Sequence, residues 1–545
     1  MGVAAVLLTS LAVLSNVSAR TPAASRFLEK RQSGGGGDLS DLYSTQNFTM
    51  PLDHFHNESR YAPHTNDTFQ QQYWVDTSNY VDGGPVIIHA MGEDPSSYDL
   101  QWLQSGLPHQ IANATGGVAV LWGQRYYQNI PIVPAGEPYT TENLRFHSTQ
   151  QAMADLAYFS QRVQFPGLEH KNLTAPSTPW IIIGGSYAGV ISAFTRIQYP
   201  DLFWGGISSS GVTTAVIDNW QMTDVVRRYG PDKCISTMQQ LMALMDNVFE
   251  SGNKTAMDDL MTGFNVSTSS SYPDLQVLLT GTVAAWEQVW NQQTTKFDGP
   301  TSYCSAILNK TYATDAPASL QATTRALLPF ANHSATPDRE ALYSPLLNAF
   351  IYVSKTNTFC AGKVVQQCLL LDEPSPFDFL SCTESGGFAT GYTPGTKGHP
   401  SALPLASRSL TPEYYLDACH KRYNITYDPR IEWYQQYGGV NMSYPRLALS
   451  TGQYDFYRPI GPLAEYVPGD GHPPYVPNNR IKSNGTDSEP QIVIAGGYHE
   501  WDFPGFLANE TDHPAVPSAV QNAKNREIKA VKLWLEEFNK THAHS

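Results

Sequence analysis

Three reactive side chains follow apolar segments that have the length and composition of buried β-strands. A serine hydroxyl becomes a good nucleophile when a histidine accepts its proton, and the imidazole needs an acid that fixes its tautomer and stabilises the imidazolium. These residue types therefore predict nucleophilic catalysis, provided that the fold brings the three loops together. The residues are Ser186 after Trp180–Ile183, Asp455 after Arg446–Ser450, and His499 after Gln491–Ala495.

The segment around Ser186 predicts a strand, a sharp turn and a helix. The apolar run ends in Gly184 and Gly185, and from Val190 onward apolar residues recur three and four positions apart. Small residues allow the strained turn that lifts a hydroxyl above the edge of a sheet, the nucleophile elbow. The usual elbow is G-x-S-x-G, but Ala188 stands here at the last position, with glycine one place later. The short pattern alone fits a Gly-Ser loop between a strand and a helix equally well.

The order of the three residues along the chain favours catalysis over three unrelated loop residues. Ser186, Asp455 and His499 follow one another in the order that α/β-hydrolases use. Each also lies at the carboxyl end of a predicted strand, where sites form in parallel sheets. We therefore predict that Ser186 is the nucleophile, His499 the base and Asp455 the orienting acid. His499-Glu500 does not begin a zinc motif, because position 503 is Phe, and we expect no cofactor and no metal.

Backbone N–H groups near Ser186 are expected to form an oxyanion hole. One donor should be Tyr187, directly after the nucleophile, and the other should come from the loop after the strand Pro85–Ala90, where we select Gly92. Glu93 has two interpretations, since a pocket carboxylate can capture a cationic part of the substrate or only orient the loop. Glu93 and Val190 are counted among the expected substrate-binding residues.

The remaining pattern predicts an α/β fold interrupted by a helical insertion. Buried strands alternate with helical periodicity such as that of Thr149–Val163, which indicates a parallel sheet covered on both faces. Phe69–Val75 alternates and is expected to be an edge strand. Long amphipathic stretches follow, and then buried strands return before a C-terminal amphipathic helix. We therefore expect an α/β-hydrolase core at residues 40–211 and 441–540, and a helical cap at residues 212–440.

The N-terminal residues predict secretion. Residues 1–19 have the apolar core and the small-residue end of a signal peptide, and no later stretch is long and apolar enough to span a bilayer. Residues 20–31 are expected to be a pro-segment ending in Lys30-Arg31, or else an uncut flexible arm. The net charge of −15 argues against nucleic acid as a partner. We expect an extracellular protein, or one of a vacuole or lysosome-like compartment, that is not held in a membrane.

Covalent modifications fit the same environment. Asn-x-Ser/Thr sequons recur along the whole chain, which predicts N-linked glycans. The six cysteines are even in number, so a secreted chain should form three disulfides whose connectivity the sequence leaves open. A cluster at Asp53–His56 has no standard metal-ligand spacing, and structural histidines explain it better. The cysteines are Cys234, Cys304, Cys360, Cys368, Cys382 and Cys419.

Several motifs together resemble the prolyl carboxypeptidase family of serine peptidases, the S28 family. This family includes lysosomal prolyl carboxypeptidase, the dipeptidyl peptidase II relatives and fungal secreted prolyl peptidases. The similarity extends from about Leu42 to Phe538 and is weaker in the helical block. The motifs are Leu52-Asp53-His54-Phe55, Thr68-Phe69-x-Gln71-x-Tyr73-Trp74, Gly92-Glu93, Arg125-Tyr126-Tyr127, Gly184-Gly185-Ser186-Tyr187, Gly452-x-x-Asp455 and Gly496-Gly497-x-His499.

The resemblance implies an α/β-hydrolase core with a disulfide-bonded helical cap and cleavage after proline or small residues at acidic pH. It implies the pairs Cys234–Cys304 and Cys382–Cys419, with Cys360–Cys368 as the third bridge. In the family, the aromatic residue two places after the acid lines the proline pocket, and here that residue is Tyr457 instead of the usual tryptophan. The family also has Glu-His-Arg where this chain has Gly123-Gln124-Arg125, and often a second histidine at Glu500.

The sequence therefore predicts a secreted serine peptidase that acts on peptides or proteins through an acyl-enzyme. It leaves open whether cleavage is internal or at a chain end, as in a carboxypeptidase, an aminopeptidase or a dipeptidyl-peptidase. It also leaves the oligomeric state open. One alternative is a secreted esterase or lipase on the same fold, and another is a binding protein with an inactive α/β-hydrolase-like site.

Overall fold

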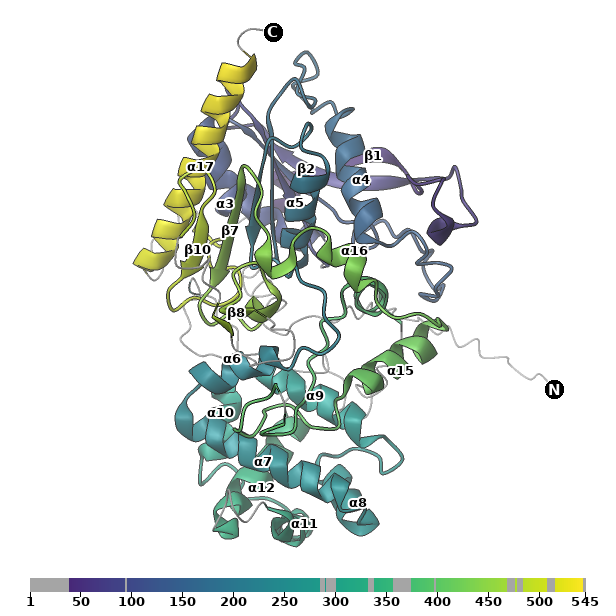
Figure 1. Cartoon of the computed structure of the whole chain (residues 1–545), viewed down its shortest axis with the longest axis vertical. Helices are drawn as coiled ribbons and strands as arrows, with labels where there is room; N and C mark the ends of the chain where they lie inside the picture. Colours follow the sequence, from purple (N-terminus) through teal and green to yellow (C-terminus); the bar gives the residue numbers. More distant parts are fainter. Residues whose placement is uncertain are drawn as a thin grey trace, which may run out of the picture.

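The structure is a computed structural model of the 545-residue chain. It describes residues 39–542 apart from 94–95, 285–289, 291–299, 332–337, 356–373, 397, 468–475, 478–483 and 507–514. The expected signal peptide and pro-segment lie outside the described residues, as does the predicted bridge Cys360–Cys368. Figure 1 shows a sheet with helices on both sides, and a separate helical body below it.

One mainly parallel sheet forms the core of the first body. Its strand order is β1-β2-β4-β3-β5-β6-β7-β10, eight strands within the described residues. β1 and β2 are antiparallel, β2 and β4 are antiparallel, and all later neighbours are parallel. The strands are β1 (Gln46–Pro51), β2 (Thr68–Asp76), β3 (Val86–Ala90), β4 (Val118–Trp122), β5 (Trp180–Gly185), β6 (Gly205–Ser209), β7 (Leu447–Gly452) and β10 (Gln491–Ile494).

Strands are present at each of the predicted apolar runs, with one error of position in the sheet, whereas β1 was not predicted. The run Phe69–Val75, expected at the edge, is β2 and pairs on both sides, with β1 and with β4. The edge is β1, whose exposed and half-buried residues alternate. The first three residues of β2 pair only with β1 and alternate between exposed and half-buried. The residues from Gln71 onward are mostly buried.

Alternate residues of the strands point to two different helical layers, as the pleat of a strand requires. Ile88 and Ile182 pack with α4 (Thr149–Ser160) and α5 (Ser186–Gln198). Their neighbours Ile87 and Ile181 pack on the opposite face with α3 (Leu107–Thr115) and α17 (Ser518–His542). In Figure 1, α17 runs beside β10 and β7 at the far edge of the sheet. The predicted α/β class with a helical insertion is confirmed.

The lower body in Figure 1 is built by helices α6 to α12. They enclose their own apolar cluster, which includes Leu241, Leu260 and Phe350. The predicted bridge Cys234–Cys304 is present and joins α7 to α10. The helices are α6 (Gln221–Tyr229), α7 (Asp232–Glu250), α8 (Lys254–Gly263), α9 (Tyr272–Ala284), α10 (Pro300–Leu308), α11 (Ala318–Leu327) and α12 (Tyr343–Lys355).

The last part of the insertion packs on the sheet body instead of on that cluster. Leu380 and Tyr434 belong to the cluster of α4 and α5, and Phe379 and Tyr423 pack with Tyr126. The elements are α14 (Pro376–Leu380), a π-helix, η6 (Ser381–Ser385), α15 (Pro412–Tyr423) and α16 (Ile431–Gln435). The insertion that we expected to form one cap therefore consists of two structural parts.

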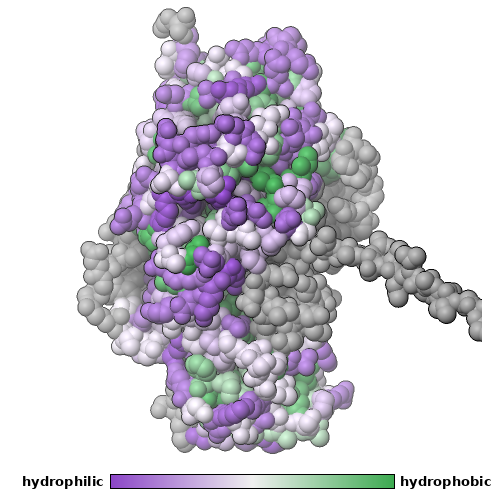
Figure 2. All heavy atoms as spheres, turned by 90° about the vertical axis from the view of Figure 1, so that its right-hand side faces the viewer, coloured by the Kyte–Doolittle hydropathy of each residue, from purple (hydrophilic) through white to green (hydrophobic). Residues whose placement is uncertain are grey.

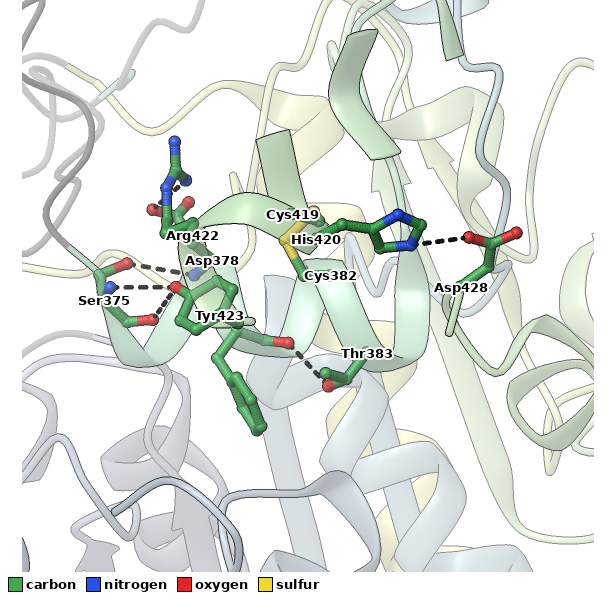
Figure 3. Close-up of a disulfide and its surroundings, with 10 residues drawn as sticks. Ser375, Asp378, Cys382, Thr383, Cys419, His420, Arg422, Tyr423 and Asp428 are labelled. Carbon is green, nitrogen blue, oxygen red and sulfur yellow. Dashed lines mark hydrogen bonds and ion pairs between the residues drawn. A yellow bond between two sulfur atoms is a disulfide. The ribbon is translucent and has the colours of Figure 1, made fainter. Parts of the chain in front are cut away.

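The predicted bridge Cys382–Cys419 holds this second part together, because it joins η6 to α15. Figure 3 shows the bridge among local hydrogen bonds. The Tyr423 hydroxyl donates to the Ser375 carbonyl at 2.8 Å and accepts from the Ser375 N–H at 3.1 Å. Arg422 forms an ion pair with Asp378 at 3.3 Å.

Short elements complete the described part of the chain. They are α2 (Leu39–Leu42), the 3₁₀ helices Ser59–Tyr61, Ser96–Leu103, Leu328–Phe330, Arg339–Leu342, Gly439–Asn441 and Arg458–Ile460, and the strand pair Tyr466–Val467 and Val476–Pro477. On the face shown in Figure 2, hydrophilic residues predominate and hydrophobic ones form small separate groups. Among the described helices, none combines the length and the apolar composition needed to cross a bilayer.

Candidate active site

Ser186 occupies the turn between β5 and α5 in a left-handed backbone conformation. Its φ is 53°, in a region that L-residues rarely adopt. The turn is possible because its flanks are small: a Cβ on Gly184 would lie 2.1 Å from the carbonyl oxygen of Ala188. Ser186 begins α5 and is partly exposed, whereas the residues on either side are buried. This is the strained strand-turn-helix geometry that the pattern around Ser186 predicts.

The loop that carries His499 touches this turn. A Cβ on Gly185 would lie 2.0 Å from Oε1 of Glu500 and 2.5 Å from its Cδ. The residue before Ser186 is thus in contact with the residue after His499. The structure therefore brings the serine and histidine loops together, although they follow β5 and β10, which are three strands apart in the sheet.

Asp455 and His499 face each other directly. Nδ1 of His499 lies 3.0 Å from each carboxylate oxygen of Asp455. Because a carboxylate only accepts, the proton of the neutral ring is on Nδ1 and Nε2 carries the lone pair. Backbone hydrogen bonds tie the two loops together, from Gln453 N–H to the Ile494 carbonyl at 3.0 Å and from Tyr454 N–H to the Gly497 carbonyl at 2.8 Å.

Asp455 is completely buried, yet it remains the stronger acid of the pair. Burial by itself raises the pKa of its carboxyl, but the charge and hydrogen bond of His499 and donors around it hold that pKa below the ordinary value. The donors are the Tyr457 N–H at 2.8 Å and the Thr451 hydroxyl at 3.2 Å. The acid is therefore negatively charged when His499 needs a counter-ion.

Ser210 is a contributor that the sequence analysis missed. It follows β6, lies between the serine and acid loops and has a φ of 49°. Its hydroxyl accepts the N–H of Glu500 at 3.0 Å, and a hydrogen bond from Ser210 is among the causes that lower the pKa of Asp455. Its own N–H donates to the Ser450 carbonyl at 2.7 Å. A hydroxyl at the carboxyl end of the strand between β5 and β7 was the available signal.

Aromatic side chains surround the acid and histidine loops. The ring of Tyr457 lies 5.0 Å from the imidazole of His499, between centroids. Phe456 and Tyr498, the neighbours of the acid and the histidine, are buried in the apolar cluster of α6 to α12. Tyr454 contacts Tyr229 at the end of α6, with centroids 4.8 Å apart. The lower body therefore packs directly against the two loops.

The expected oxyanion loop lies near the elbow, and one expected substrate contact does not reach a surface. Burial, followed by the charges of Glu384 and Glu93, raises the pKa of Tyr187, which places both carboxylates close to that side chain. Gly92 and Glu93 are half-buried. Val190 is completely buried in the cluster of α4 and α5, so in this structure it has no surface to offer a substrate.

A second buried hydrogen-bond network connects Tyr187, the residue after Ser186, to the start of α4 and to η6. The Tyr187 hydroxyl lies 3.4 Å from that of Thr149 at the start of α4. Glu384 accepts the Thr149 N–H at 3.0 Å and pairs with Arg60 at 2.7 Å. Glu384 lies in η6, two residues after Cys382, so the second part of the insertion supports the first turn of α4 and the elbow.

Two members of the Asp53–His56 cluster form hydrogen bonds with side chains outside it. Nε2 of His54 lies 2.7 Å from a carboxylate oxygen of Asp155, and Asp53 lies 2.8 Å from Nδ1 of His64. The buried Arg125 completes the network with two bonds to Asp155, of 2.6 and 2.7 Å. Within the part of the chain that the structure describes, no group of three or more His, Cys, Asp or Glu side chains could hold a metal ion.

The sheet order, the strained serine turn and the acid–histidine pair define an α/β-hydrolase fold with the residues of a serine hydrolase in that fold's order. The family model described as serine carboxypeptidase S28 matches residues 50–476. The chain belongs to this family of serine peptidases and is an enzyme of the serine peptidase class.

Curated relatives agree with the family. The chain is similar to a probable extracellular serine carboxypeptidase of Arthroderma benhamiae, with 32% identity over 92% of this chain and 69% of that protein. It is also 24% identical to the serine protease vicPb of Bipolaris victoriae, over 91% of this chain and 90% of that protein. It is 22% identical to lysosomal Pro-X carboxypeptidase of Bos taurus, over 91% of this chain and 89% of that protein. Among solved structures, the chain is similar to a proline iminopeptidase of Mycobacterium smegmatis, with 11% identity and a TM-score of 0.33 over 91% of this chain and 99% of that chain.

The contact between Gly185 and Glu500 gives the first prediction. Gly185→Ala should lower kcat/KM by about ten- to a hundredfold, because overpacking of a fixed contact costs roughly 1–3 kcal/mol. In a Glu500→Ala background the same substitution should cost nothing further, since the colliding carboxylate is gone. Gly184→Ala is the matched control, because it collides with backbone and Glu500→Ala cannot rescue it. Equal losses from Gly185→Ala in both backgrounds would contradict the contact.

Ser210 gives the second prediction. Ser210→Ala removes a hydrogen bond to a charged carboxylate, worth about 1.5–3 kcal/mol, so kcat should fall roughly ten- to a hundredfold while KM changes little. Ser208→Ala is the control, since Ser208 is a buried serine of the same strand whose hydroxyl has no partner among the described residues. Steady-state kinetics that show the same loss for both variants would remove Ser210 from the site.

Proposed function

We propose that the protein is a secreted peptidase that hydrolyses peptide bonds through an acyl-enzyme on Ser186. The observation that carries this proposal is the pairing of His499 Nδ1 with the buried Asp455 carboxylate at 3.0 Å, which makes Nε2 the basic nitrogen of the ring. His499 takes the proton of Ser186 as the hydroxyl oxygen attacks the carbonyl carbon. It then gives that proton to the leaving amine, and water hydrolyses the ester by the same steps in reverse.

The N–H groups of Tyr187 and Gly92 are proposed to stabilise the oxyanion of the tetrahedral intermediate. Tyr187 supports this role because its side chain is fixed in a buried network, which holds its backbone at the start of α5. Preorganised N–H donors cost no rearrangement when the negative charge develops. Glu93 remains proposed as a contact to the substrate or as a residue that orients this loop.

Cleavage after proline or a small residue, in acid, is the proposed specificity. The flat ring of Tyr457, 5.0 Å from the His499 ring, can pack against a pyrrolidine ring or another compact side chain. The names of the relatives, among them Pro-X carboxypeptidase, are consistent with action at the carboxyl end of a peptide. The lowered pKa of Asp455 supports activity in acid, because this carboxylate stays charged as the pH falls.

Secretion and N-glycosylation are proposed with this activity. Every sequon asparagine among the described residues, from Asn47 to Asn539, is exposed and accessible to a glycan. Recovery of the protein from the culture medium, with a loss of mass after enzymatic deglycosylation, is the expected result. Retention of the protein inside the cell would contradict it.

A substrate panel tests the function and forms the third prediction. Blocked dipeptides and longer peptides with Pro, Ala or Leu before the scissile bond are compared, each with a free and an amidated carboxyl end, between about pH 4 and pH 8. We expect the highest kcat/KM for Pro or Ala with a free carboxyl end on the acid side. Ser186→Ala should be inactive on all peptides. Hydrolysis of p-nitrophenyl acyl esters without any peptide cleavage would favour the esterase alternative and overturn the proposal.

A further inference from the structure

A second buried carboxylate lies directly behind the acid and histidine loops. Asp502 follows His499 by three residues and is completely buried. It accepts the hydroxyl of Ser209 on Oδ1 and that of Ser450 on Oδ2. These serines stand next to Ser210 and Thr451, which contact Glu500 and Asp455. Asp502 therefore joins the end of the histidine loop to β6 and β7 where they approach the catalytic acid.

Glu527 of α17 brings another carboxyl to the same place. It is also completely buried, and its charge state is coupled to that of Asp502. Neither of its oxygens accepts a hydrogen bond from a donor in the described residues, since the one hydrogen of the Ser450 hydroxyl is directed at Asp502. A hydrogen bond to Asp502 is among the causes that raise the pKa of Glu527, and a hydrogen bond between two carboxyl groups requires a proton on one of them. Burial, followed by the charge of Asp502, raises the pKa of Glu527 well above its ordinary value.

The other titratable side chains around Asp502 and Glu527 lie on α17, β3 and α3. Lys524, one turn before Glu527, is buried and donates to the Pro504 carbonyl, and it acts on Glu527 as the nearby cation. Burial lowers the pKa of Lys524 to about 8. On β3, His89 packs against Phe503, and burial lowers the pKa of its imidazole to about 3, so this ring is neutral. On α3, the titratable side chain is His109, whose Nδ1 is 2.9 Å from the Leu103 carbonyl. β6, β7 and β10 carry no titratable side chain.

With one shared proton the two carboxyl groups carry a single negative charge beside the cation Lys524, so the cluster is electrically balanced. Removal of that proton leaves an uncompensated negative charge between α17 and the sheet, in a place without access to water. An uncompensated buried charge costs several kcal/mol, so the contact between the helix and the loop must weaken when the proton leaves.

We propose that Asp502 is a positioning residue for the catalytic loops, and that its proton-sharing contact with Glu527 is a clamp that holds in acid and opens toward neutral pH. The clamp would fix the loop after His499 between α17 and the carboxyl ends of β6 and β7. It goes beyond the proposed function and does not depend on which peptide bond is cleaved, because its first consequence is for stability.

The raised pKa of Glu527 decides whether folding stability rises or falls with pH. Glu527 has a higher pKa in the folded protein than in the unfolded chain, where a glutamate has about 4.3. Its stabilising contribution is therefore complete below about pH 4.3 and is lost as the pH rises through the folded pKa. In that window the folded state holds one proton more, so the equilibrium constant for folding falls by about tenfold per pH unit from this group.

The fourth prediction uses Glu527→Gln, which keeps the size of the side chain and a hydrogen-bond donor without a dissociable proton. We expect its thermal unfolding midpoint to match that of the wild type near pH 4 and to exceed it by a margin that grows up to about pH 8. Its half-life of activity at neutral pH should lengthen in parallel. Glu536→Gln is the matched control, because Glu536 lies on the same helix but is exposed, and its difference from the wild type should not vary with pH. A pH-independent difference for Glu527→Gln would overturn the clamp.

Asp502→Asn provides a second measurement that does not require the first variant to fold. Without the Asp502 charge, only burial still raises the pKa of Glu527, so the loss of stability with rising pH should end at a lower pH and be smaller in total than in the wild type. If Asp502 positions the loops, kcat should also fall about tenfold or more with KM little changed. A wild-type pH slope together with a wild-type kcat would overturn the proposal. These outcomes are separate from the peptide panel, since stability is measured without substrate.

Discussion

A negative charge without access to water is the constraint on which the site depends. An ionised carboxylate loses several kcal/mol of solvation when it is buried, unless charges and hydrogen bonds replace the water. Asp455 obtains those partners from three loops: the imidazole of His499, the N–H of Tyr457, and the hydroxyls of Thr451 and Ser210. Because the donors come from the ends of β6, β7 and β10, the parallel order of these strands is the condition for the acid to stay charged.

The two parts of the insertion act on this site from different sides. The α6 to α12 body receives Phe456 and Tyr498, the neighbours of the acid and the histidine, into its apolar cluster. The second part, closed by Cys382–Cys419, places Glu384 under the elbow, where it accepts the first N–H of α4 and pairs with Arg60. The loops of Ser186 and His499 are therefore each in contact with a different part of the insertion.

Local patterns made most of the sheet and the acid–histidine pair predictable, because strands and turns are encoded over a few residues. β5 begins at Trp180, as its apolar run predicts, and the serine turn has the strained backbone that its small neighbours indicate. Features that depend on contacts between distant segments were not predictable. Phe69–Val75 gave no sign that β1 would pair with it. The apolar periodicity that begins at Val190 did indicate a buried helix face, and Val190 is buried there. Ser210 and Asp502 reach their partners on other strands only because strand ends meet. The insertion forms two parts because the segment around Cys382–Cys419 packs on the sheet body and not on the helices α6 to α12. No local sequence pattern predicts which of these surfaces a segment will contact.

The central claim is that Ser186 is a nucleophile activated by the His499–Asp455 pair. Its most direct test is labelling of the purified protein with a fluorophosphonate, followed by mass spectrometry of the modified peptide, since this reagent reacts with activated serines without any need for a peptide substrate. We predict stoichiometric modification at Ser186 in the wild type, and a loss of labelling rate of at least about a thousandfold in His499→Ala, whose fold is checked by circular dichroism. Labelling at another serine, or equal rates in the wild type and His499→Ala, would contradict the account.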